Sequence, residues 1–257
     1  MANVQVVILA GGLGSRLAEE THSIPKPMVT IGEEPILLHL MRYFASFGHV
    51  NFVIALGYKG SVIKDYFRNF TQNSSSLRIQ MTNSEIEILN KGECAWTIDL
   101  IDTGLETATG GRLRKLAPYL DQTFVMTYGD GLSDVNLQEL VKFHSEIGTL
   151  ATVTAVQPPA RFGALELEGD QVTAFREKSK TDVSWINGGF FVLNKEILKY
   201  IESDSIPFEE SPLRTLADSG ELSAFKHRGF WQPMDTLRDK LYLEDIWRNQ
   251  VAPWARK

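Results

Sequence analysis

Hydrophobic and polar positions in the first half of the chain follow the patterns of buried strands and amphipathic helices in turn. Residues 4–10 form a continuous apolar run that ends at two glycines, which is typical of a strand covered on both faces of a sheet. Apolar residues then recur at helical spacing over 36–47. Residues 51–56 read as the next strand and 61–70 as the next helix. Strand–helix–strand order with short connections predicts a parallel sheet with right-handed crossovers.

The second half continues this pattern and then changes to shorter β segments. We expect a strand at 123–127, a helix at 137–147 with Asn136 as its N-cap, and a strand at 150–156. Further short strands are predicted at 164–167, 172–175 and 189–193, and a last amphipathic helix at 236–248. The pattern therefore predicts an α/β fold: a doubly wound, mostly parallel, Rossmann-like sheet with a smaller β-rich lobe.

A glycine-rich loop follows the first predicted strand. Glycines let backbone amides approach a polyphosphate, and an arginine adds a planar cation that can bind phosphate oxygens with two hydrogen bonds. No Lys-Ser or Lys-Thr follows, as a Walker loop requires, and no third glycine opens a helix, as the dinucleotide fingerprint requires. A turn without a ligand is the alternative. The loop consists of Leu9, Ala10, Gly11, Gly12, Leu13, Gly14, Ser15 and Arg16.

Lys26 lies between Pro25 and Pro27 in the segment that follows this loop. The two prolines restrict the backbone and present the ammonium group at a set place. From these residues alone, an exposed lysine in a stiff turn is an equally good interpretation.

Composition narrows the class of protein. The net charge of −6 argues against a nucleic-acid binder with a broad basic face, but allows a small anionic ligand. A single cysteine, Cys94, excludes an intrachain disulfide and suits a reducing cytoplasm. We expect no signal peptide and no membrane span, because no apolar run reaches about 18 residues.

The glycine loop followed by Pro-Lys-Pro-Met, with Lys26 ten residues after Arg16, resembles the signature of sugar-phosphate nucleotidyltransferases. Six further stretches resemble the branch of that family that transfers a cytidylyl group to glucose 1-phosphate. They are 57–60 (Gly-Tyr-Lys-Gly), 109–112 (Thr-Gly-Gly-Arg), 128–131 (Tyr-Gly-Asp-Gly), 161–164 (Arg-Phe-Gly-Ala), 187–191 (Asn-Gly-Gly-Phe-Phe) and 229–236 (Gly-Phe-Trp-Gln-Pro-Met-Asp-Thr). Segment 71–96 matches poorly and bears on oligomer contacts or base recognition.

The resemblance implies an enzyme that joins CTP and α-D-glucose 1-phosphate into CDP-glucose and pyrophosphate, for deoxysugar and O-antigen precursors. It also implies one nucleotidyltransferase domain over 1–257, with a nucleotide-binding half at about 1–156. The acceptor-binding half and the C-terminal helix would then occupy about 157–257. A homo-oligomer is implied as well, with a hexamer as one such state.

Asp130 and Asp235 are the candidate metal ligands. Mg²⁺ prefers hard oxygen ligands and usually takes one or two carboxylates together with phosphate oxygens and water. Asp-Gly is also a common turn pair, and an aspartate before a helix is also a common N-cap. The resemblance implies that both residues bind Mg²⁺, and that Arg16 and Lys26 neutralise the phosphates at the reacting centre.

The remaining site residues come from the resemblance. Small residues and then basic ones open a helix near 107–115, and a helix N-terminus suits anions. The implied nucleotide-binding residues are Leu9 to Arg16, Lys26, Thr107, Arg112, Gly129 and Asp130. The implied acceptor-binding residues are Arg112, Glu177, Lys178, Asn187 and Gly188. The family's usual Glu-Lys-Pro reads Glu-Lys-Ser here, at 177–179.

Three alternatives stay open. The same chemistry can serve another base or another phosphorylated acceptor, because only the base-contacting loop and residues 178–188 need to differ. An inactive nucleotide-binding protein with a regulatory role is a second class. A Rossmann-type oxidoreductase is the third, and the absence of a third glycine speaks against it.

Overall fold

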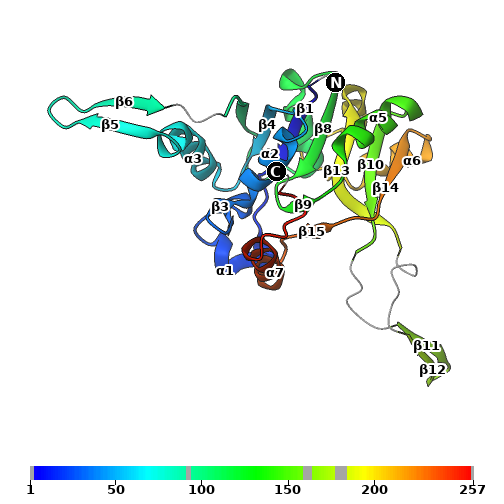
Figure 1. Ribbon diagram of the computed structural model, residues 1–257. Coiled ribbons are helices and arrows are strands. Elements are labelled where there is room, and N and C mark those ends of the chain that lie inside the picture. Colours follow the sequence, from blue (N-terminus) through cyan, green and yellow to red (C-terminus); the bar gives the residue numbers. More distant parts are fainter. Residues whose placement is uncertain (1–2, 91–93, 159–163, 177–183, 256–257) are drawn as a thin grey trace.

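A central β-sheet organises the computed structural model, which describes residues 3–90, 94–158, 164–176 and 184–255. The sheet has seven strands: β1 (Gln5–Leu9), β4 (Asn51–Leu56), β7 (Thr97–Asp102), β8 (Thr123–Tyr128), β10 (Ala151–Val156), β13 (Ile186–Asn194) and β14 (Leu222–His227). Their spatial order is β14-β10-β13-β8-β1-β4-β7 (Figure 1).

Most neighbouring strands of this sheet are parallel, as the sequence predicts. β1 pairs in parallel with β4 and β8, β4 with β7, and β10 with β14. β13 is antiparallel to both of its neighbours, β8 and β10. The expected α/β fold with a mostly parallel sheet is therefore confirmed.

The order of the strands places a topological switch point beside β1. The chain runs outward from β1 through β4 to β7 and then crosses back to β8, on the other side of β1. Open α/β sheets bind ligands at the carboxyl ends of the strands where the order reverses. The glycine loop follows β1 and Gly129 follows β8, so both lie at this point.

Both faces of β1 are buried, which explains why its residues after Gln5 are all apolar. Val6 and Ile8 belong to one hydrophobic cluster, and Val7 and Leu9 belong to the cluster on the opposite face. Successive side chains of a strand point to opposite faces, so a helical layer must cover each side of the sheet.

Helices cover both faces of the sheet (Figure 1). Their bounds are α1 (Ala18–Thr21), α2 (Ile36–Ala45), α3 (Gly60–Asn73), α4 (Thr109–Lys115), α5 (Leu137–Ile147), α6 (Ser211–Asp218) and α7 (Leu237–Arg248). Short 3₁₀ turns occupy Ser15–Leu17, Lys26–Met28, Ala117–Tyr119 and Lys195–Tyr200. The side chain of Asn136 accepts hydrogen bonds from the amides of Gln138 and Glu139, which confirms the predicted N-cap of α5.

The second half of the chain contributes to the same sheet. β13 and β14 both lie in the seven-stranded sheet. The run from Phe190 to Leu193 in β13 is buried and apolar toward both faces. The hairpin of β11 (Ala164–Glu168) and β12 (Gln171–Arg176) forms a separate two-stranded sheet.

A second hairpin, β5 (Ser76–Gln80) with β6 (Glu85–Asn90), extends away from the body beyond α3 (Figure 1). Leu77 lies opposite Ile88 and Ile79 opposite Ile86, which gives the ribbon one aliphatic face. Arg78 and Glu87 form an ion pair on the other face. An isolated two-stranded hairpin is marginally stable in water.

Two short ladders complete the fold. β2 (Thr30–Ile31) pairs with β3 (Glu34–Pro35), and β9 (Gly131–Ser133) pairs antiparallel with β15 (Trp231–Pro233). Over the described ranges, the fold contains no helix with the length and apolar character needed to cross a bilayer.

Candidate active site

The glycine loop is anchored at its base by the strands on either side of β1. The amide of Ala10 donates to the carbonyl of Ala55 at 3.0 Å, and the amide of Gly129 donates to the carbonyl of Leu9 at 3.0 Å. The amide of Tyr58 donates to the carbonyl of Gly11 at 3.1 Å. These bonds fix where the loop leaves the sheet, so the following glycines begin from a rigid base.

Lys26 is buried, which rules out the alternative of an exposed lysine in a turn. It opens a 3₁₀ turn whose preceding residue, Pro25, is extended. Its side chain is only 10% exposed, and its Nζ lies 2.6 Å from Asp130 Oδ2 and 2.6 Å from Asp235 Oδ1. Burial alone would lower the pKa of Lys26, but the two carboxylates outweigh burial and raise that pKa above its usual value. The ammonium group is therefore charged at neutral pH.

The β9–β15 ladder brings Asp130 and Asp235 together. Gly131 pairs with Pro233, and the amide of Met234 donates to the carbonyl of Asp130 at 2.8 Å. Each aspartate therefore lies at the same end of the ladder, although the two are far apart in sequence. Arg16 completes the charged group, with NH1 at 3.0 Å from Asp235 Oδ2.

Asp235 does not act as an N-cap. Thr236 caps α7 through a reciprocal capping box with Asp239, in which each side chain bonds the other's backbone amide. The helix thus begins without the Asp235 carboxylate, which instead contacts Lys26 and Arg16.

The carboxylates of Asp130 and Asp235 fit a divalent cation. A single positive group, the Lys26 ammonium, lies within 2.6 Å of an oxygen of each, so both carboxylates converge on one point. Within the described residues, no group of three or more His, Cys, Asp or Glu side chains could hold a metal. A cation bound here would need ligand oxygens or water for its other positions, which is how Mg²⁺ sites are commonly built.

A cavity of about 590 Å³ opens at this edge of the sheet. Nearly all described site residues expected from the sequence line it: Leu9, Ala10, Gly11, Gly12, Gly14, Ser15, Arg16, Lys26, Thr107, Arg112, Gly129, Asp130, Asn187, Gly188 and Asp235. Leu13 is 58% exposed and does not line it. Glu177 and Lys178 fall outside the described residues.

Several lining residues were not expected from the sequence. Tyr128, Thr109 and Trp231 all face the cavity. Trp231 donates from Nε1 to the carbonyl of Gly188 at 2.7 Å, and so fixes the backbone beside Asn187. Each of the three lies inside a stretch that resembles the family. The sequence did not single them out, because an aromatic or hydroxyl residue near a glycine does not by itself predict a place in a cavity wall.

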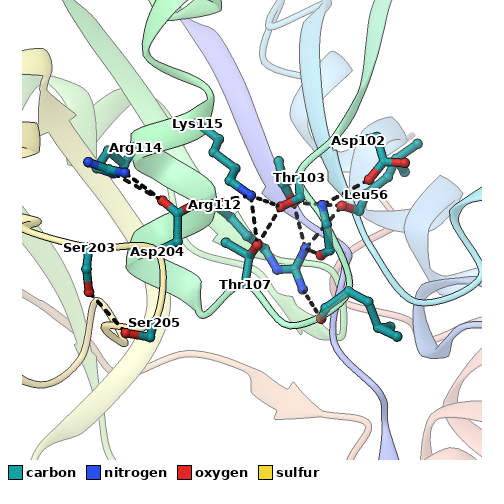
Figure 2. A network of polar contacts seen from close by, with 12 residues as sticks. Leu56, Asp102, Thr103, Thr107, Arg112, Arg114, Lys115, Ser203, Asp204 and Ser205 are labelled. Carbon is teal, nitrogen blue, oxygen red and sulfur yellow. Dashed lines mark hydrogen bonds and ion pairs between the residues drawn. The ribbon is translucent and has the colours of Figure 1, made fainter.

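Arg112 occupies a different environment from the one that the resemblance implies. Its guanidinium group donates to the carbonyl of Leu56 at 3.1 Å (Figure 2). The same group donates to the carbonyls of Gly11 and Gly104 at 3.0 and 2.8 Å. It also bonds Thr103 Oγ1 at 2.6 Å and the carbonyl of Leu105 at 3.3 Å. These acceptors lie at or just beyond the carboxyl ends of β1, β4 and β7, so Arg112 ties three strand ends together. A direct contact with phosphate stays a prediction.

Two glycines make room for this guanidinium group. A Cβ on Gly11 would lie 2.2 Å from Arg112 NH1, and a Cβ on Gly57 would lie 2.5 Å from the same atom. Gly12, by contrast, has open space where a Cβ would be. Close packing against Arg112 therefore requires Gly11, whereas a Cβ on Gly12 would meet no atom within 4 Å.

The basic residues after Arg112 lie at the surface but are not simply solvated. Arg114 NH2 lies 3.0 Å and Lys115 Nζ 3.3 Å from the carboxylate of Asp204 (Figure 2). Lys115 also donates to Thr107 Oγ1 at 3.1 Å, and Thr107 Oγ1 donates to the carbonyl of Thr103. Thr107 is thereby fixed at the cavity wall.

We expect Arg112→Met to lower the free energy of unfolding by about 3 kcal/mol, because several buried carbonyls lose a charged donor. Arg114→Met is the matched control: Arg114 is half exposed and its ion pair with Asp204 should contribute less than about 1 kcal/mol. Urea unfolding of both variants measures the difference. Equal losses in the two variants would show that Arg112 does not hold the strand ends together.

Comparisons with known proteins find similar sequences along nearly the whole chain. The sequence profile of the nucleotidyl transferase family matches residues 5–239. A glucose-1-phosphate cytidylyltransferase of Salmonella typhi is 49% identical over 253 residues, which cover 98% of each chain. A probable glucose-1-phosphate cytidylyltransferase of Bacillus subtilis is 39% identical and covers 98% of this chain and 99% of its own.

Solved structures share the fold. HddC from Yersinia pseudotuberculosis, complexed with GMP-PN, superposes with a TM-score of 0.68 at 25% identity, over 95% of this chain and 99% of that one. An inositol-1-phosphate CTP transferase from T. maritima superposes with a TM-score of 0.66 at 16% identity, over 98% and 99% of the two chains. The second likeness concerns the fold alone.

Proposed function

Because the chain belongs to the nucleotidyl transferase family, we propose that it transfers the cytidylyl group of CTP to α-D-glucose 1-phosphate. The products are CDP-glucose and pyrophosphate. The observation that carries this proposal is the group formed by Arg16, Lys26, Asp130 and Asp235 beside the glycine loop. The choice of base and acceptor rests on the Salmonella typhi relative, which is 49% identical along nearly the whole chain.

The reaction needs little covalent work from the protein. A phosphate oxygen of glucose 1-phosphate attacks the α-phosphorus of CTP, a new P–O bond forms, and the bond to pyrophosphate breaks. The acceptor phosphate is already an anion at neutral pH, so no general base is required. The protein's contribution is to position the two substrates and to neutralise the charge between them.

The described residues suit these tasks. Lys26 and Arg16 place two cations beside the glycine loop, and we assign them to the phosphates at the reacting centre. Gly12, with open space on its Cβ side, leaves its backbone accessible to a triphosphate. Asn187 and Gly188 line the same cavity, where we assign them to the acceptor together with Glu177 and Lys178.

Nucleotidyltransferases of this family use a divalent metal, and we propose that this chain uses Mg²⁺ held by Asp130 and Asp235. When bound, the cation would withdraw charge from the phosphate oxygens as the bond to pyrophosphate breaks. Lys26 contacts both carboxylates, so its ammonium group would have to share them with the metal or turn toward the phosphates.

We further propose that 1–257 act as one catalytic domain, with a nucleotide-binding half at about 1–156 and an acceptor-binding half after it. We also propose that copies assemble into a homo-oligomer, with a hexamer as one such state. The exposed aliphatic face of the β5–β6 hairpin supports a partner for that ribbon. A reducing cytoplasm stays the expected compartment, on the single Cys94.

Pyrophosphate release tests the proposed function directly. The protein is incubated with Mg²⁺ and α-D-glucose 1-phosphate, and CTP, UTP, dTTP, ATP and GTP are offered in turn. Release with CTP well above the other nucleotides is the expected result. Release with another base would keep the chemistry and overturn the base assignment. If no nucleotide supports release, the acceptor is wrong, and the next assay varies it with CTP fixed.

A further inference from the structure

The hydroxyl groups of Tyr128 and Thr109, in the wall of the cavity, are both hydrogen-bonded to the carboxylate of Glu209, which does not line the cavity. Tyr128 ends β8 and Thr109 opens α4, and both face the cavity. Glu209 lies on the loop before α6 and is exposed. The hydroxyl group of Tyr128 donates to Glu209 Oε1, and Thr109 Oγ1 donates to Glu209 Oε2 at 2.5 Å. One carboxylate therefore connects two elements of the cavity wall.

The position of Glu209 is fixed by its neighbours. Phe208 is fully buried and packs edge-on against Phe191 of the central sheet, with ring centroids 5.7 Å apart. The amide of Phe208 donates to Thr109 Oγ1 at 2.8 Å. Thr109 thus accepts from the loop backbone and donates to the loop carboxylate, and this double contact holds Glu209 against the wall.

The direction of these hydrogen bonds decides what the cavity can recognise. A carboxylate only accepts hydrogen bonds, so the Tyr128 proton must point to Glu209. The phenolic oxygen then has only lone pairs to offer to a group in the cavity.

We propose that Glu209 is a positioning residue for the acceptor side of the cavity: by accepting the hydrogen bond of the Tyr128 hydroxyl, it leaves the phenolic oxygen as an acceptor for a sugar hydroxyl. The chemical class recognised is a hydroxyl-bearing sugar phosphate whose hydroxyl donates to Tyr128. Glu209 itself does not touch the substrate and acts through Tyr128. This inference rests on the proposed function and deepens it.

Steady-state kinetics of pyrophosphate release test the proposal. Without Glu209 the Tyr128 hydroxyl is free to turn, and about 1 kcal/mol of acceptor binding should be lost. Glu209→Ala should therefore raise the KM for glucose 1-phosphate about fivefold to tenfold, with kcat and the KM for CTP unchanged. Glu209→Gln keeps an acceptor oxygen for Tyr128 and should recover most of that loss. Glu210→Ala, at the adjacent exposed position, is the matched control and should behave like the wild type.

A double-mutant cycle separates this role from a general structural one. Tyr128→Phe should raise the same KM, and adding Glu209→Ala should raise it no further, because both changes remove one interaction. Additive effects, or an equal change in the KM for CTP, would overturn the inference while the proposed function stood. A wild-type protein that released no pyrophosphate with any sugar 1-phosphate would overturn both.

Discussion

Replacing Asp130 by asparagine is expected to lower kcat by about a thousandfold and to remove its dependence on Mg²⁺. The amide has the size of the carboxylate but no charge, so it cannot hold a divalent cation against a triphosphate. The fold should survive, because the contact that anchors Asp130 to β15 is made by its backbone carbonyl. Pyrophosphate release measured over a range of Mg²⁺ concentrations gives kcat and its dependence on Mg²⁺.

Asp65→Asn provides the control for this substitution. Asp65 is exposed on α3, and its nearest cation is Arg68 at 3.7 Å, far weaker than the 2.6 Å contact of Asp130 with Lys26. The control should match the wild type in kcat and in metal dependence. If the Asp130 variant also matched it, Asp130 would be only a partner for Lys26, and the metal would have to bind elsewhere.

Lys26→Met should lower kcat by about a hundredfold to a thousandfold, by analogy with removal of one preorganised donor from a charged transition state. Methionine keeps the length and the apolar stem but removes the charge that both carboxylates contact. The loss should fall on kcat more than on the KM for CTP, because the charge that Lys26 neutralises grows as the bond to pyrophosphate breaks.

Lys142→Met is the matched control for the Lys26→Met substitution. Lys142 is exposed on α5 and pairs with Glu146 at 3.6 Å, so its removal should change neither rate nor stability measurably. Circular dichroism and urea unfolding of Lys26→Met separate a misfolded protein from an inactive one. A folded variant with unchanged turnover would contradict the role assigned to Lys26.

Elements with strong local signals could be predicted from the sequence. β4 has the predicted bounds, and α5 begins after the predicted cap at Asn136. The apolar run after Gln5 in β1 correctly indicated burial on both faces. In each case the signal lies within the element itself, so no knowledge of distant partners was needed.

Elements whose stability depends on distant partners could not be predicted. The β5–β6 hairpin turns at Ser84, which has a positive φ of 58° but is not a glycine, so the usual turn signal is missing. β13 joins the sheet in the antiparallel sense, and an apolar run does not reveal its direction. The short β9 and β15 are strands only because they pair with each other.

The site likewise combines residues that could be predicted from local motifs with residues that could not. The glycine loop and the two aspartates stand out as motifs, and the structure brings them to one cavity. Their individual roles stay predictions. The surroundings of Arg112 could not be foreseen, because its partners are backbone carbonyls from three strand ends. Glu209 lies outside every motif, and only its contacts with Tyr128 and Thr109 draw attention to it.

The β9–β15 ladder also sets the order in which the protein can mature during synthesis. Asp130 leaves the ribosome long before Asp235, and it is the β9–β15 ladder that aligns the two residues. A nascent chain that has released only its first half contains β1, β4, β7 and β8. It still lacks β15 and therefore the Asp235 carboxylate of the charged group. Catalytic competence should therefore appear late in translation, and a fragment ending before β15 should be able to collapse around its sheet without acquiring activity.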